Sequence, residues 1–160
     1  AALLVADVYG GHPAAGSALA VAKAMSWIAA NRPSVINVSL VGPRNRLVER
    51  AVAAVQAKGI KVVAAVGNDG PAAPPLYPAS RALHLDYSAP GADMAAALPG
   101  EGYAKVRGTS FAAPFVTSRL ALTGSTSRLD TEADRKGFGR IGRGIICKPC
   151  RVPPRKVGAK

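Results

Sequence analysis

The residue with the clearest chemical potential is Ser110, which follows Gly108 and Thr109 at the start of a stretch with helically spaced apolar residues. A serine at a helix N-terminus lies near the positive end of the helix dipole and near unpaired N–H groups, which can stabilise an oxyanion. The small residues before it let a substrate backbone approach closely. However, Thr109 or Ser110 can equally be a simple helix cap, and the tripeptide alone does not decide between these roles.

A second candidate is Asn68, which follows an apolar stretch and lies between two glycines, Gly67 and Gly70. In open parallel sheets, ligands bind beyond the carboxyl ends of the strands, and Asn68 is predicted to lie at such an end. Its side-chain amide could donate to a developing oxyanion. The alternative is an ordinary turn asparagine that tolerates a left-handed conformation.

The elements that must position these residues follow from the spacing of the apolar residues. That spacing predicts strands at 3–8, 35–40 and 61–66, and helices at 18–29 and 48–55. Strands that alternate with helices through short links indicate parallel strands with right-handed crossovers. The sequence therefore predicts an α/β sheet with helices packed on its faces.

Capping residues predict where these two helices begin and end. Ser17 is a suitable N-cap for the first helix, and Asn31 followed by Arg32 and Pro33 should end it. Gly59 is placed to stop the second helix.

The second half of the chain has weaker patterns. A helix is predicted from Thr109 to Leu122, with Pro114 in or near its first turn, where a missing N–H costs little. Short strands are predicted at 84–88 and 94–97. From Thr123 onward the sequence is rich in turn residues and basic residues, and no further element is predicted.

Composition indicates a globular protein, because 49% of the 160 residues are hydrophobic and only 19% are charged. No apolar run approaches the roughly 20 residues that cross a bilayer, so no membrane span is expected. The net charge is +12, and residues 135–160 hold nine basic residues and no acidic one. Such a tail could meet nucleic acid, anionic lipid or an acidic partner, but we expect a solvated, poorly ordered end and no nucleic-acid partner.

Six segments, taken in chain order, resemble motifs of the subtilisin-like serine peptidases (subtilases, peptidase family S8). Gly108 to Pro114 resembles the signature around the nucleophilic serine, in which Gly-Thr-Ser leads a helix and a proline lies four residues on. The others are 35–40 (a pocket-lining strand), 64–70 (the oxyanion-asparagine loop), 77–79 (the segment shortly after that loop), 88–91 (the turn before the nucleophile) and 139–146 (the closing glycine-rich segment).

The resemblance implies a fold and a domain organisation. The fold would be α/β: a three-layer α/β/α arrangement with a mostly parallel sheet, subtilisin-like and truncated. Residues 1–146 would form a partial subtilisin-like peptidase domain, and residues 147–160 a basic, Pro-rich C-terminal tail.

The resemblance also implies roles for single residues. Ser110 would be the nucleophile that forms an acyl-enzyme, and Asn68 the oxyanion donor, aided by the Ser110 backbone N–H. An extended polypeptide substrate would bind along residues at the strand ends: Ser39, Leu40, Val41, Gly42, Ala64, Ala65, Gly67, Gly108 and Thr109.

The sequence departs from the family at the other two triad positions. Subtilases order their triad Asp, His, Ser, and the 160 residues contain no Asp-Ser/Thr-Gly or His-Gly-Thr-His motif. Asp7 falls in a predicted strand, His12 in a turn, and His84 beside Asp86 in a stretch expected to be structural.

Since an unassisted serine is a weak nucleophile, we expect little or no peptidase activity from this chain alone. An N-terminal segment would supply the Asp and His. The alternative is a non-catalytic, subtilase-like peptide-binding module, which the missing residues and the shortened stretches 80–88 and 122–138 also suggest.

Cys147 and Cys150 form a CxxC pair, for which a local disulfide, free thiols, a redox pair and half of a zinc site are the alternatives. We favour the disulfide, in an exported protein (periplasmic or secreted), as the resemblance implies. No metal site is expected from the residues. Calcium is a cofactor that the resemblance allows, but no ligands can be assigned.

Overall fold

The computed structural model describes residues 2–11, 16–70, 74, 76–79, 86–136 and 142–159. In chain order its elements are α1 (Ala18–Ala30), β1 (Val35–Val38), α2 (Arg46–Ala57), β2 (Lys61–Ala64), β3 (Met94–Ala97), β4 (Tyr103–Val106), α3 (Thr109–Thr123), α4 (Thr126–Glu132) and two short 3-10 helices, η2 (Lys148–Cys150) and η3 (Pro154–Lys156). None of the helices among the described residues combines the length and hydrophobicity that crossing a bilayer requires.

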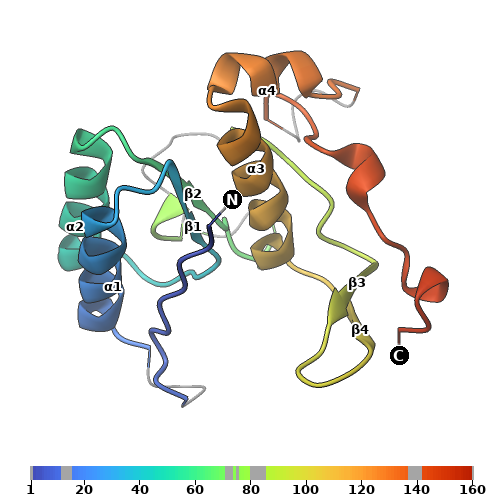
Figure 1. Ribbon diagram of the computed structural model, residues 1–160, viewed down its shortest axis with the longest axis horizontal. Coiled ribbons are helices and arrows are strands. Elements are labelled where there is room, and N and C mark those ends of the chain that lie inside the picture. The colour runs from blue at the N-terminus through green and yellow to red at the C-terminus, as the bar shows by residue number, and fades with distance from the viewer. Residues whose placement is uncertain are drawn as a thin grey trace.

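The centre of the fold is a parallel pair of strands, β1 and β2, with Val35 opposite Lys61 and Val38 opposite Ala64. Helices α1 and α2 lie on one side of this pair and α3 on the other (Figure 1). The predicted three-layer α/β/α arrangement with parallel strands is therefore confirmed. A separate antiparallel hairpin, β3–β4, follows.

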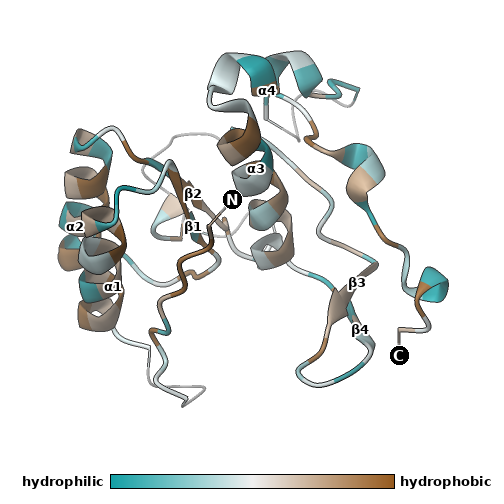
Figure 2. Ribbon diagram, viewed as in Figure 1, coloured by the Kyte–Doolittle hydropathy of each residue, from teal (hydrophilic) through white to brown (hydrophobic). Residues whose placement is uncertain are grey.

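Alternation along β1 explains why helices cover both faces. Ile36 and Val38 are buried in one cluster with residues of α1 and α2, whereas Val35 packs on a second cluster formed with α3 and α4. Successive side chains of a strand point to opposite faces, so one apolar strand supplies both cores. Figure 2 shows hydrophobic colouring along both central strands. Leu129 and Ile146 are fully buried in the second cluster.

The local signals at the helix ends are confirmed. The Ser17 hydroxyl accepts a hydrogen bond from the Ala20 N–H at 3.1 Å, as an N-cap does. Asn31 is the C-cap of α1. Gly59 follows α2 with a φ of +76°, a left-handed conformation that glycine adopts without steric cost.

The prediction of a buried strand at 3–8 is wrong. Residues 2–7 form no regular structure, and Leu3 and Val5 are 86% and 73% exposed. An apolar run shows that a segment prefers burial, but a strand also needs a neighbour with which to form a ladder.

The second half of the chain contains more structure than the sequence predicted. Strand 94–97 is confirmed as β3, and the helix from Thr109 is confirmed as α3, although Pro114 is its sixth residue rather than part of the first turn. Strand β4 and helix α4 were not predicted. Of the strand predicted at 84–88, residues 84 and 85 lie outside the described residues, and Tyr87 and Ser88 form only isolated bridges.

The prediction of a solvated, poorly ordered C-terminal end is wrong, because hydrogen bonds hold this basic segment against the rest of the fold. The Ala95 N–H donates to the Val152 carbonyl at 3.0 Å. The Arg151 guanidinium donates to the Asp93 carbonyl at 3.1 Å. Cys147 and Cys150 form a disulfide, as favoured from the sequence.

Candidate active site

Asn68 and the start of α3 are joined by hydrogen bonds although 41 residues separate them. The Thr109 N–H donates to Asn68 Oδ1 at 2.9 Å. Gly108, the N-cap of α3, has no side chain that could cap the helix, so Asn68 provides the cap from the loop that follows β2. With its oxygen engaged, the amide faces Gly108, where a Cβ atom would lie 3.3 Å from Asn68 Nδ2.

The hydroxyl of Thr109 fixes the loop that carries Asn68. It accepts a hydrogen bond from the Gly67 N–H at 3.1 Å and lies 3.1 Å from the Gly67 carbonyl oxygen. Gly67 has a φ of +99°, and a Cβ atom there would lie 2.7 Å from Leu76 Cδ1. A glycine is therefore required at this turn, and the predicted residues Gly67, Asn68, Gly108 and Thr109 are brought together.

Ser110 lies next to Ser39 at the carboxyl end of β1, through a reciprocal pair of hydrogen bonds. The Ser110 hydroxyl donates to the Ser39 carbonyl at 3.1 Å, and the Ser39 hydroxyl donates to the Ser110 carbonyl at 2.8 Å. Both residues are half-buried. The predicted nucleophile and the first residue of the predicted pocket wall are thus in direct contact.

A close backbone approach supports the turn before Ser110. The Gly108 N–H donates to the Gly91 carbonyl at 2.7 Å. A Cβ atom at Gly91 would lie 2.8 Å from the Gly108 carbonyl oxygen and 3.0 Å from Ala112 Cβ. Only glycine fits at position 91 without a shift.

The two predicted pocket walls, 39–42 and 64–67, lead on from the parallel strands β1 and β2. The Ala65 N–H donates to the Val38 carbonyl at 3.1 Å, which extends the strand pairing toward them. Ala65 is buried, Val41 is exposed, and Leu40 packs against the first core cluster. Gly42 forms an antiparallel bridge with Tyr77.

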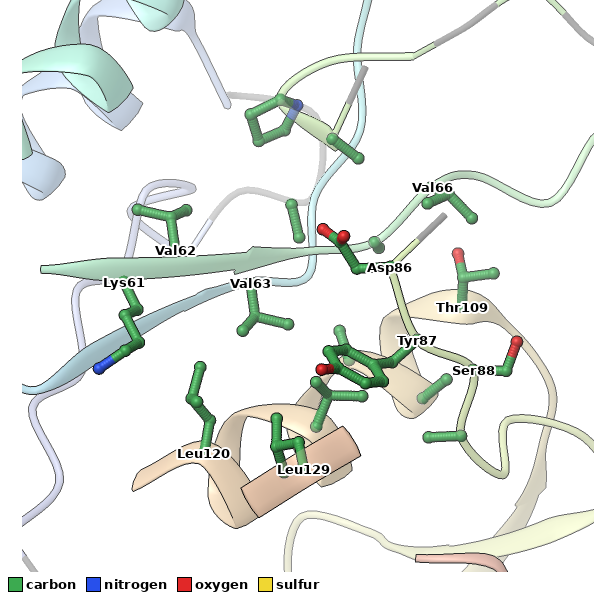
Figure 3. Close-up of a pocket in the computed structure, with 18 of the residues that line it drawn as sticks. Lys61, Val62, Val63, Val66, Asp86, Tyr87, Ser88, Thr109, Leu120 and Leu129 are labelled. Carbon is green, nitrogen blue, oxygen red and sulfur yellow. The ribbon is translucent and has the colours of Figure 1, made fainter. Parts of the chain in front are cut away.

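A cavity of about 490 Å³ lies beside these walls, between β2 and α3 (Figure 3). Ala64, Ala65 and Thr109 line it, but Ser110 and the wall 39–42 do not. Tyr87 also lines the cavity, and its hydroxyl donates to Asp130 Oδ1 at 2.7 Å. Burial, together with this hydrogen bond, raises the pKa of Tyr87 to about 12.

Asp7 has a structural role in its own loop. Its carboxylate accepts hydrogen bonds from the N–H groups of Tyr9, Gly10 and Gly11 at 2.8, 3.1 and 3.2 Å. These bonds, that of Tyr9 foremost, lower the pKa of Asp7. His12 and His84 lie outside the described residues. The described part of the chain brings together no group of three or more His, Cys, Asp or Glu side chains that could hold a metal ion.

Two polar residues near Ser110 were not singled out from the sequence. Asn37 lies in β1 and donates from Nδ2 to the Ser39 hydroxyl at 2.9 Å. The hydroxyl of Thr117 in α3 lies 2.9 Å from Asn37 Oδ1. The available signal for Asn37 was a lone amide inside the otherwise apolar stretch Val35–Val38.

The model of the subtilase family matches residues 1–91. The chain belongs to the subtilase family. It is 33% identical over 134 residues to subtilisin Savinase from Lederbergia lenta, an alignment that covers 70% of this chain and 49% of that protein. A subtilisin from Bacillus pumilus is 32% identical over 127 residues, with 61% of this chain and 45% of that protein covered.

The fold is subtilisin-like. A crystal structure of a cold-adapted subtilisin-like serine proteinase superposes with a TM-score of 0.67 at 24% identity, covering 82% of this chain and 60% of that one. The chain spans about half the length of the two subtilisins named above. The region that matches the family ends before Ser110.

Proposed function

We propose that the protein is a serine-type endopeptidase that hydrolyses peptide bonds through an acyl-enzyme on Ser110. The observation that carries the proposal is the placement of Ser110 at the N-terminus of α3, with Asn68 fixed beside that terminus by the Thr109 N–H at 2.9 Å. Attack by Ser110 Oγ on a peptide carbonyl forms the C–O bond and leaves negative charge on the carbonyl oxygen. The Ser110 N–H and Asn68 Nδ2 are the donors for that oxyanion.

The proton of Ser110 must go to a base, and we propose that a segment outside these 160 residues supplies the His and the Asp. The His accepts the proton during attack and returns it to the leaving amine, after which water hydrolyses the ester. The Ser110 hydroxyl donates to the Ser39 carbonyl, so it must first turn toward that base. The 160-residue chain alone is therefore inactive in this proposal.

The substrate is an extended polypeptide that binds along the walls 39–42 and 64–67 with backbone hydrogen bonds. We further propose that the protein is exported, to the periplasm or the medium. The disulfide between Cys147 and Cys150 supports this location, because disulfides persist in oxidising compartments.

The test is active-site labelling with a fluorophosphonate probe, with and without the segment that carries the Asp and His. Labelling that needs the segment and is lost in Ser110→Ala supports the proposal. The matched control is Ser118→Ala, because Ser118 lies on the same helix and, among the described residues, its hydroxyl bonds only the nearby Phe115 carbonyl, at 3.0 Å. Labelling that survives in Ser110→Ala refutes the proposal. So does a lack of labelling in the completed protein, meaning the chain together with the segment that carries the Asp and the His.

A second candidate function is a non-catalytic, subtilase-like peptide-binding module. The observation that favours it is the Ser110 hydroxyl itself, which donates to the Ser39 carbonyl oxygen rather than to a base among the described residues. Peptide binding without turnover in the completed protein would support this module, and efficient turnover would exclude it.

A further inference from the structure

Pro114 removes the helical hydrogen bond that Ser110 would otherwise receive. In an α-helix the N–H of a residue donates to the carbonyl four residues earlier, so residue 114 is the partner of the Ser110 carbonyl. Proline has no N–H, and its ring crowds that same carbonyl. Pro114 is inside α3, so the Ser110 carbonyl must find another donor.

Ser39 is that donor. Its hydroxyl donates to the Ser110 carbonyl at 2.8 Å across 71 positions of the sequence. A hydroxyl has one proton, and Ser39 receives a hydrogen bond from Asn37 Nδ2 at 2.9 Å, which leaves that proton for Ser110.

The chain of hydrogen bonds that includes Asn37 and Ser39 also contacts α3 at a second residue, Thr117. The Thr117 hydroxyl lies 2.9 Å from Asn37 Oδ1 and 3.0 Å from the Ala113 carbonyl oxygen, and its one proton is shared between these acceptors. Thr117 lies seven residues after Ser110, about two turns along the same face of α3. The path Thr117–Asn37–Ser39–Ser110 therefore ties the first turn of α3 to the end of β1, and the bond from the Ser110 hydroxyl to the Ser39 carbonyl at 3.1 Å closes it.

We propose that Asn37, Ser39 and Pro114 are positioning residues that set the place of Ser110 relative to β1. Pro114 frees the Ser110 carbonyl from the helix, Ser39 binds it, and Asn37 orients Ser39. The consequence for catalysis rests on the proposed peptidase function, whereas the hydrogen bonds themselves do not.

The hydrogen bond can be observed directly, because Ser110–Phe111 is the only Ser-Phe pair in the sequence. A sample with ¹³C-carbonyl serine and ¹⁵N-phenylalanine therefore gives one carbonyl–amide NMR correlation, which reports the Ser110 carbonyl. Ser39→Ala should move its ¹³C signal upfield, as loss of a donor does. Adding Pro114→Ala should move it back, since residue 114 then has an N–H. Ser118→Ala is the control and should leave the signal in place.

Stability and reactivity complete the test. The fall in urea midpoint caused by Ser39→Ala should be smaller in the Pro114→Ala background than in the parent chain, because the carbonyl has regained a donor. In the protein completed with its Asp and His segment, Ser39→Ala should slow fluorophosphonate labelling about tenfold to a hundredfold, and Ser39→Thr, which keeps the hydroxyl, should restore it.

The outcomes separate this proposal from the peptidase proposal. An unchanged Ser110 carbonyl signal in Ser39→Ala, or equal midpoint losses in both backgrounds, overturns the positioning role. Normal labelling of Ser39→Ala overturns its link to reactivity. If the completed parent protein is not labelled at all, the peptidase proposal fails, and the carbonyl signal still decides whether Ser39 binds Ser110.

Discussion

Gly91→Ala tests whether the turn before Ser110 is as tightly packed as its distances indicate. The added Cβ would lie 2.8 Å from the Gly108 carbonyl oxygen and 3.0 Å from Ala112 Cβ, and neither neighbour is the end of a flexible side chain. Backbone or helix must move, and overpacking of this kind costs about 1–3 kcal/mol. With a urea m-value of about 2 kcal/mol/M, a loss of 2 kcal/mol lowers the unfolding midpoint by about 1 M.

The matched control is Gly42→Ala, because a Cβ atom at Gly42 meets nothing within 4 Å and its φ is not positive. This substitution should be neutral or should stabilise the chain by about 0.4–1 kcal/mol, through reduced entropy of the unfolded state. The assay is urea unfolding of the 160-residue chain followed by circular dichroism. Equal midpoints for Gly91→Ala and the parent chain would refute the close packing of Gly91 on Gly108.

Three further predictions concern the stability of the fold. Burial and the hydrogen bond to Asp130 hold the pKa of Tyr87 at about 12, above its ordinary 10.0, so the stabilisation by the neutral hydroxyl is complete below pH 10 and is lost as the pH rises through 12. The urea midpoint of Tyr87→Phe should therefore fall less over this pH range than that of the parent chain. An unaltered pH profile in this variant would contradict the prediction. Leu129→Ala should lower the free energy of unfolding by about 2–5 kcal/mol, because Leu129 is fully buried. Leu122→Ala, at a position that is 71% exposed, should lower it by less than about 0.5 kcal/mol. Similar urea midpoints for the two variants would contradict this difference. Asn45→Ala should cost about 1 kcal/mol, measured in the same way, because Asn45 Oδ1 caps the Leu47 N–H at 3.0 Å; no loss would mean that the cap contributes nothing.

Features set by neighbouring residues could be predicted from the sequence. Helix α1 begins after Ser17 because the Ser17 hydroxyl accepts from an N–H only three residues further on. Helix α2 ends before Gly59 because that one residue adopts a left-handed conformation. The parallel order of 35–38 and 61–64 followed from two apolar strands with a helix between them.

Features that depend on distant partners were missed or wrong. The run 3–8 is apolar enough for a strand, yet no described strand pairs with it. Strand β4 is four residues long, and α4 is seven residues long and mostly polar, so neither has a clear periodicity.

The candidate site shows the same difference between local features, which could be predicted, and contacts between distant residues, which could not. Ser110 and Asn68 could be selected from their motifs, because each motif is local. The bond from Thr109 to Asn68 and the reciprocal pair of Ser39 with Ser110 could not, because they span 41 and 71 positions. A proline four residues after a serine suggests a free carbonyl, but nothing in the sequence indicates its partner.

Asn68 serves the helix as well as the proposed chemistry, and this affects how the site can evolve. Residues at functional sites are often poor choices for stability, so replacing them commonly stabilises a protein while its activity falls. Here the same amide caps the first N–H of α3 through its oxygen and carries the proposed oxyanion donor on its nitrogen. A substitution that removes both the oxygen and the nitrogen of this side chain, such as Asn68→Ala, therefore loses both contributions together. Replacement of Asn68 by a residue without a capping oxygen would carry a folding penalty even in a descendant that no longer cleaves peptides, so a capping oxygen at position 68 should outlast the activity.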